Sequence, residues 1–112
     1  MVGTKLVPWG QRRVNPDDTR MERAHVTVRG RVQAVGFRAH VERAARETGI
    51  SGWVRNVGED MVEAVAEANA TALERFLDLM RTGPLGARVD SMQVERGSFM
   101  GEFEAFSVRR SV

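Results

Sequence analysis

The hydrophobic pattern of the chain changes its period once within residues 23–48. Alternating apolar residues predict a strand over about 23–29, and apolar residues at helical spacing predict a helix over 37–48 that ends at Gly49. A strand that turns through a short loop into a helix directs several unpaired backbone N–H groups, and the positive end of the helix dipole, at one point. This region therefore predicts a loop that binds an anion.

An arginine follows the loop in the first helical turn. The loop and the first helical turn read Gly30-Arg31-Val32-Gln33-Ala34-Val35-Gly36-Phe37-Arg38. The planar guanidinium of Arg38 carries a fork of N–H donors that matches the oxygens of a phosphate or a carboxylate. The loop and this arginine together predict a phosphate-binding cradle.

Composition limits the classes of site that the chain can build. Its 112 residues suit one domain, and the absence of cysteine excludes disulfides, thiolate nucleophiles, iron–sulfur clusters and cysteine-bound zinc. Two histidines do not support a histidine-rich metal site. No apolar run approaches the roughly 20 residues that cross a bilayer. We expect a cytoplasmic monomer that needs no metal or cofactor and binds no membrane.

The net charge of +2 lies in the first twenty residues, where four basic and two acidic side chains occur. Basic and acidic side chains balance in the rest of the chain. Nucleic-acid binding usually depends on a broad basic surface. We therefore expect no nucleic-acid partner.

The regular pattern begins after residue 20. Residues 1–20 contain prolines and glycines and show no sustained hydrophobic period, which predicts a flexible N-terminal extension before a domain over 21–112. Asn69 is expected to cap a second helix, which Gly83-Pro84 ends. Alternation and turn signals predict the remaining elements: strands over about 50–57, 61–68, 88–95 and 103–109, and a turn at 58–60.

The order of these elements is β-α-β-β-α-β with one added strand. It predicts an α+β fold of the ferredoxin-like, split β-α-β class, with an antiparallel sheet and both helices on one face. The first two strands are joined by a crossover helix, so they should run parallel, with the third strand between them. Right-handed crossover then places both helices on the same side. Asn56 ends the second strand, so we expect it near the cradle although it is distant from Arg38 in sequence. Its amide both donates and accepts hydrogen bonds and can hold a water molecule.

Two motifs resemble the signatures of a known family. The nonamer over 30–38 and, at the proper distance, Gly52-Trp53-Val54-Arg55-Asn56 resemble the acylphosphatase family. Segments 62–67 and 83–89 resemble later parts of that family, so the resemblance covers about residues 23–110. It implies hydrolysis of small acyl phosphates to a carboxylate and inorganic phosphate, without a metal or cofactor.

The resemblance also implies roles for individual residues. Arg38 would be the catalytic arginine that binds phosphate, and Asn56 would orient the attacking water. Because a carboxylate is a good leaving group, positioning and preorganised charge carry most of such a reaction. Backbone amides of the loop would form the cradle: Arg31, Val32, Gln33, Ala34, Val35 and Gly36.

The chain departs from the family pattern at two positions. Ala34 stands where the family usually has glycine, and a side chain at positive φ costs about 1 kcal/mol. Met61 stands where many relatives carry the glycine of an Asp-Gly turn. Gly58 is expected to supply the flexible position of that turn instead.

Several other residues are expected to be structural. Trp53 is expected in the core, and His25 on the outward face of its strand. His40 is expected to be a packed or solvated helix residue. Glu63 and Glu67 share one face of a strand without an evident partner. We assign none of these residues a catalytic role.

Two alternatives use the same fold. RNA-recognition domains share the order of elements but stack bases on aromatic side chains of central strands, and residues 61–68 contain none. A non-hydrolytic anion-binding domain, like the one at the front of the large hydrogenase-maturation carbamoyltransferase, has little reason to keep both Arg38 and Asn56.

Overall fold

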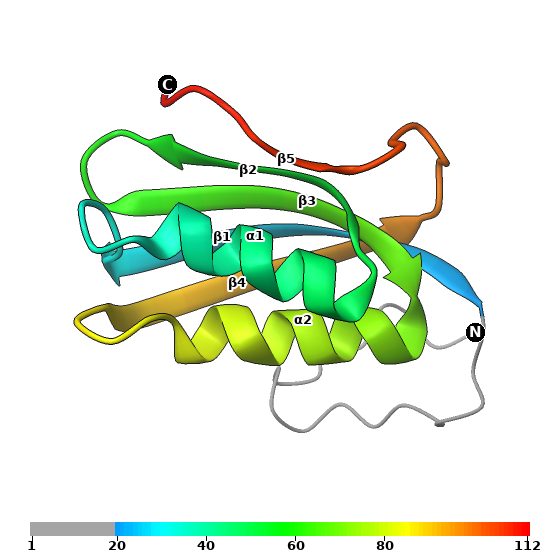
Figure 1. Cartoon of the computed structure of the whole chain (residues 1–112), viewed down its shortest axis with the longest axis horizontal. Helices are drawn as coiled ribbons and strands as arrows, with labels where there is room; N and C mark the ends of the chain where they lie inside the picture. Colours follow the sequence, from blue (N-terminus) through cyan, green and yellow to red (C-terminus); the bar gives the residue numbers. More distant parts are fainter. Residues whose placement is uncertain (1–19) are drawn as a thin grey trace, which may run out of the picture.

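The computed structural model describes residues 20–112, so nearly all of the predicted N-terminal extension lies outside the described residues. The elements follow the predicted order (Figure 1). They are β1 (Met21–Arg31), α1 (Phe37–Thr48), β2 (Ser51–Val57), β3 (Met61–Asn69), α2 (Ala70–Thr82), β4 (Arg88–Ser98) and β5 (Phe106–Val108).

The five strands form one sheet in the order β4-β1-β3-β2-β5. β1 and β2 each pair antiparallel with β3, so they run parallel to each other with β3 between them, as predicted. The predicted fold class is confirmed. The sheet is mixed rather than wholly antiparallel, because β5 pairs in parallel with β2. β4 runs antiparallel to β1, so it ends at the same end of the sheet at which β2 starts. The segment after β4 crosses to β2 at that end, and β5 therefore runs in the same direction as β2.

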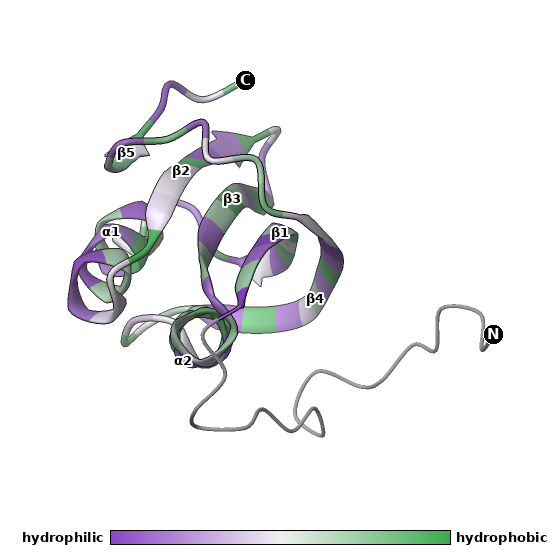
Figure 2. Cartoon of the chain, turned by 90° about the vertical axis from the view of Figure 1, so that its right-hand side faces the viewer, coloured by the Kyte–Doolittle hydropathy of each residue, from purple (hydrophilic) through white to green (hydrophobic). Residues whose placement is uncertain are grey.

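Both helices lie on the same face of the sheet (Figure 2). The hydrophobic core lies between the helices and the sheet. Period-two alternation on the strands and helical spacing on α1 and α2 direct apolar side chains into this layer. The largest fully buried side chains come mainly from the two helices: Phe37, Phe76, Leu73, Leu77 and Met80. No helix within residues 20–112 is long and apolar enough to cross a membrane.

Local signals place the helix ends where the sequence predicts them. Helix α1 ends at Gly49, which takes φ 73° and donates its N–H to the Ala45 carbonyl. The Asn69 side chain accepts a hydrogen bond of 2.8 Å from the Ala72 N–H and caps α2. The last strand is shorter than predicted, covering only Phe106–Val108, and β4 extends three residues beyond its predicted end at 95.

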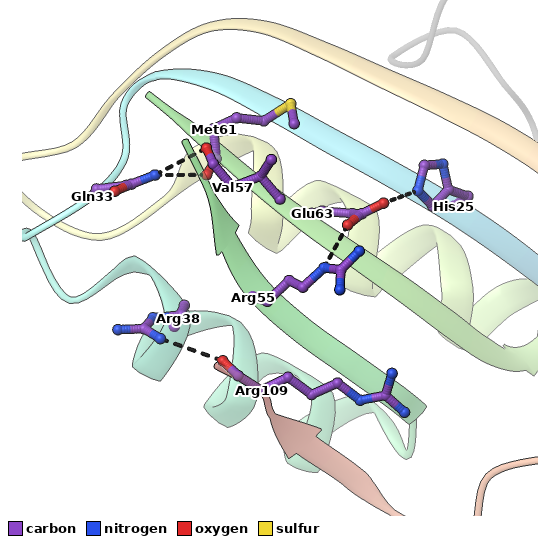
Figure 3. Close-up of polar contacts among 8 residues, drawn as sticks. All are labelled: His25, Gln33, Arg38, Arg55, Val57, Met61, Glu63 and Arg109. Carbon is purple, nitrogen blue, oxygen red and sulfur yellow. Dashed lines mark hydrogen bonds and ion pairs between the residues drawn. The ribbon is translucent and has the colours of Figure 1, made fainter. Parts of the chain in front are cut away.

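Glu63 and Glu67, which were expected to have no evident partner, both accept hydrogen bonds on the open face of the sheet, the face away from the helices. Glu63 accepts hydrogen bonds from His25 Nε2 at 2.6 Å and Arg55 Nε at 2.7 Å (Figure 3). Glu67, which is buried, accepts from Arg23 Nη1 at 3.2 Å and from a backbone N–H at 2.7 Å. The expectation that these glutamates lack partners was wrong. Their side-chain partners lie on the neighbouring strands β1 and β2, and only the register of strand pairing shows which residues lie beside them.

Trp53 is buried, as predicted, but not in the layer under the helices. Val54 lies in that layer, so alternation places Trp53 on the opposite face of β2. The guanidinium groups of Arg55 and Arg109 lie 4.8 and 4.7 Å from the centre of its ring. Cation–π contacts with two arginines, rather than helix packing, therefore cover this indole.

The free energy of unfolding is expected to fall as the pH drops below the ordinary pKa of Glu63, 4.5. Burial alone would raise the pKa of this carboxyl, but hydrogen bonds from His25 and Arg55 outweigh burial and lower it. A lowered pKa stabilises the fold above the unfolded value, and the stabilisation is lost as the pH falls through the folded value.

Urea denaturation between about pH 3 and pH 6 measures this dependence. Glu63→Gln is expected to flatten the slope, whereas Glu95→Gln, which removes an exposed carboxylate beside the same histidine, is expected to preserve it. An unchanged slope in Glu63→Gln would contradict the assignment.

Candidate active site

The β1–α1 loop and the β2–β3 turn lie at the same end of the molecule (Figure 1). A cavity of about 350 Å³ lies there, lined by the β1–α1 loop, the start of α1 and the ends of β2 and β5. Arg38 from the first turn of α1 and Asn56 from the end of β2 both line it. Asn56 shares the helix-covered face of β2 with Val54, which explains its orientation. The other lining residues are Val32, Ala34, Gly36, Phe37, Ala39, Glu42 and Val108.

Gly30 lets the chain leave the sheet toward the cavity. The register of β1 against β4 shifts between Arg29 and Gly30, and Gly30 takes φ 138°. A Cβ at this position would lie 2.1 Å from the Arg88 carbonyl oxygen, closer than any side chain tolerates. Only glycine therefore fits the bulge that starts the loop.

The loop presents unpaired backbone donors. Within residues 20–112, the N–H groups of residues 32–36 donate to no backbone carbonyl. Helix α1 begins after Gly36 without a side-chain cap and without an acidic residue in its first turn. The positive end of the helix and these N–H groups thus remain available to an anion beside Arg38.

The C-terminal residues contact both Arg38 and Asn56. Arg38 Nη1 donates to the Arg109 carbonyl at 3.4 Å (Figure 3), and the Arg109 N–H donates to the Val54 carbonyl at 2.8 Å. The Val112 N–H donates to the Asn56 carbonyl at 3.0 Å. In the described part of the chain, the other N–H groups of the Arg38 guanidinium have no hydrogen-bond partner.

Three of the predicted cradle residues do not line the cavity. Arg31 is exposed at the end of β1 and pairs with Arg88, whereas Val35 packs against the core. The Gln33 side chain donates to carbonyl groups of the β2–β3 turn. The roles of their backbone amides stay a prediction.

Sequence reasoning missed three lining residues beyond the nonamer. Helical spacing could have found two of them, because Ala39 and Glu42 follow on the helix that carries Arg38. Val108 could not be found in this way, because it reaches the cavity through the parallel pairing of β5 with β2.

Backbone φ angles show how the chain accommodates its two departures from the family pattern. Ala34 takes φ 60° and is the only non-glycine residue with positive φ within residues 20–112. Gly58 also takes φ 60° in the turn before Met61, which confirms that it supplies the flexible position. The first departure places a methyl-bearing residue in a left-handed conformation inside the cradle.

The fold and the cavity define a small α+β protein with an arginine, an amide and free loop N–H groups at one end of its sheet. A family model described as acylphosphatase matches residues 24–108. The chain is 46% identical over 92 residues to an acylphosphatase of Methylococcus capsulatus, covering 82% of this chain and 100% of the relative. The chain belongs to the acylphosphatase family.

Solved structures agree with this assignment. The crystal structure of acylphosphatase from Bacillus subtilis matches with a TM-score of 0.76 at 31% identity, over 79% of this chain and 98% of that one. The crystal structure of HypF from T. kodakarensis matches with a TM-score of 0.69 at 35% identity. That match covers 79% of this chain but 12% of HypF, so the similarity is to one part of a much larger protein.

Ala34→Gly is expected to raise the free energy of unfolding by about 0.5–1 kcal/mol. Glycine removes the cost of a Cβ at φ 60°, and its greater freedom in the unfolded chain offsets part of the gain. Urea denaturation measures the change. The control Ala39→Gly, at a helical position that also lines the cavity, is expected to lower stability by about 1 kcal/mol. A loss of stability in Ala34→Gly would contradict the account.

Proposed function

We propose that this chain hydrolyses the carboxyl–phosphate bond of small acyl phosphates, with Arg38 binding the phosphate and Asn56 directing the attacking water. One observation carries the proposal. The two side chains come from different elements, α1 and β2, and line one cavity beside unpaired N–H groups of the loop. Membership of the acylphosphatase family supports the substrate class.

The phosphate group is bound by charge and by hydrogen bonds. The guanidinium of Arg38 and the backbone amides of the cradle over 31–36 offer several donors to its oxygens. Donors that are already oriented stabilise charge as it develops on the transferring phosphoryl group, without reorganisation during the reaction. The Arg109 carbonyl holds one edge of the guanidinium and helps to fix its direction.

Asn56 acts on the water. Its amide oxygen accepts a hydrogen bond from the water and thereby turns a water lone pair toward phosphorus. The bond from water oxygen to phosphorus forms as the bond from phosphorus to the acyl oxygen breaks. The electron pair of the broken bond leaves with the carboxylate. A phosphate oxygen accepts the proton of the water, so the reaction needs no general base. The carboxylate is a good leaving group, so the reaction needs no general acid either.

The histidines are engaged elsewhere. His40 Nε2 is 2.8 Å from the Leu79 carbonyl oxygen, in a contact between the two helices. His25 lies on the open face, bonded to Glu63. The one carboxylate that lines the cavity, Glu42, has Arg46 at 3.7 Å. These contacts favour a reaction in which positioning, rather than a histidine base, carries catalysis.

The open face does not favour RNA binding. On this face β1 and β3 carry His25 and Glu63, and the ring of Trp53 on β2 is buried under two arginines. The Glu63 carboxylate repels a phosphate backbone, and the buried ring offers bases no surface on which to stack.

Arg38→Ala and Asn56→Ala are each expected to lower the turnover of benzoyl phosphate by about 10²–10³-fold, because each removes one oriented group from the site. Turnover by the wild type is expected to persist in EDTA. Hydrolysis is followed by loss of the acyl phosphate absorbance, and circular dichroism checks that the variants are folded.

Arg43→Ala is the matched control, because it removes an exposed arginine from the same helix outside the cavity. Its turnover is expected to equal that of the wild type. Near-normal turnover in Arg38→Ala or Asn56→Ala would overturn the proposed roles. Binding of inorganic phosphate without turnover by the wild type would instead identify a non-hydrolytic anion-binding domain.

A further inference from the structure

The side chain of Gln33 turns away from the cavity although its backbone belongs to the cradle. Its Nε2 lies 3.2 Å from the Val57 carbonyl oxygen and 3.0 Å from that of Met61 (Figure 3). The same nitrogen lies 3.0 Å from the Gly58 carbonyl oxygen. The amide nitrogen has two N–H groups, so three carbonyl oxygens share two hydrogens. The side chain is thereby fastened to both sides of the β2–β3 turn.

The β2–β3 turn over 58–60 comes two residues after Asn56 and has contacts with three other segments. Besides the Gln33 amide from the cradle, the Asp60 carbonyl accepts from the Gly30 N–H at 3.1 Å. The Gly58 N–H donates to the Val112 carbonyl at 2.9 Å. The turn is therefore the place where the end of β1, the cradle and the C-terminal residues are joined to β2.

The cradle needs such an attachment for two reasons. Within residues 20–112, the loop N–H groups over 32–36 bond to no other backbone group, so they do not hold the loop in place. Ala34, the next residue after Gln33, takes φ 60°, which is unfavourable for alanine. Without an attachment, the backbone at Ala34 would therefore move to a negative φ. Among the side chains of the loop, the Gln33 amide makes the hydrogen bonds that oppose this relaxation.

We propose that Gln33 is a positioning residue that fixes the distance between the phosphate cradle and Asn56. This inference rests on the proposed function, because it concerns the alignment of the phosphate with the water that Asn56 directs. Gln33 does not line the cavity, and its side chain acts through the turn. It thus differs from Arg38 and Asn56, which face the substrate.

Loss of the Gln33 amide is expected to lower kcat more than it raises KM. Arg38 stands on the rigid helix α1 and still binds phosphate when the loop moves. A misplacement of about 1 Å between reacting groups can cost about 10²-fold in rate. For Gln33→Ala we expect kcat for benzoyl phosphate to fall by about 10–100-fold, with a change in KM of less than about threefold.

Gln33→Glu provides a second variant with nearly the same shape. An ionised carboxylate only accepts hydrogen bonds, so it cannot donate to the three carbonyl oxygens. It is expected to lower kcat at least as much as Gln33→Ala. If Gln33→Ala does not fold, as judged by circular dichroism, Gln33→Glu takes its place in the experiment.

A double-mutant cycle with Asn56→Ala separates positioning from a general loss of stability. If Gln33 acts by aligning the cradle with Asn56, Gln33→Ala is expected to have little further effect on kcat in the Asn56→Ala background. His40→Ala is the matched control, because it also removes a side-chain bond to a backbone carbonyl, at Leu79. Its effect on kcat is expected to be the same in both backgrounds.

Two results would overturn the inference: an unchanged kcat in a folded Gln33→Ala or Gln33→Glu variant, or an equal loss of kcat with and without Asn56. Neither result touches the proposed function, since the wild type would still hydrolyse benzoyl phosphate. A wild type that shows no hydrolysis would refute the proposed function itself.

Discussion

The pairing of β1 and β2 with opposite edges of β3 is the constraint on which the site depends. Because both strands run antiparallel to β3, they end at the same end of the sheet. The loop that follows β1 and the amide near the end of β2 are thereby brought together, and with the loop comes Arg38, which is 18 residues from Asn56 in the sequence. Burial of the helix-facing strand residues holds this register, since a slip by one residue would expose them.

The anion site is built mainly from main-chain geometry. Gly30 opens the sheet, Gly36 starts the helix, and the loop between them keeps its N–H groups unpaired within the described residues. One guanidinium adds the charge. The anion binding that we propose for this site needs no cluster of basic residues, which agrees with the balanced charge of residues 21–112.

Periodicity and turn chemistry predicted the parts of the structure that depend on local sequence. The bounds of α1, the Asn69 cap and the glycine at 58 are of this kind. The features that the sequence did not predict depend on which strands become neighbours. The parallel pairing of β5, the partners of Glu63 and the direction of the Gln33 side chain all follow from tertiary register, which one sequence does not display. Convergence of Arg38 and Asn56 was predictable because topology alone requires it.

The placement of Trp53 has a spectroscopic consequence. Its indole lies under the guanidinium of Arg109, whose carbonyl accepts the hydrogen bond from Arg38 on the other side of the strand. Indole emission responds to nearby cations, so a shift of β5 that accompanies occupancy of the cavity would alter the fluorescence of Trp53. Trp53 is thus connected through Arg109 to the arginine that we propose binds the phosphate.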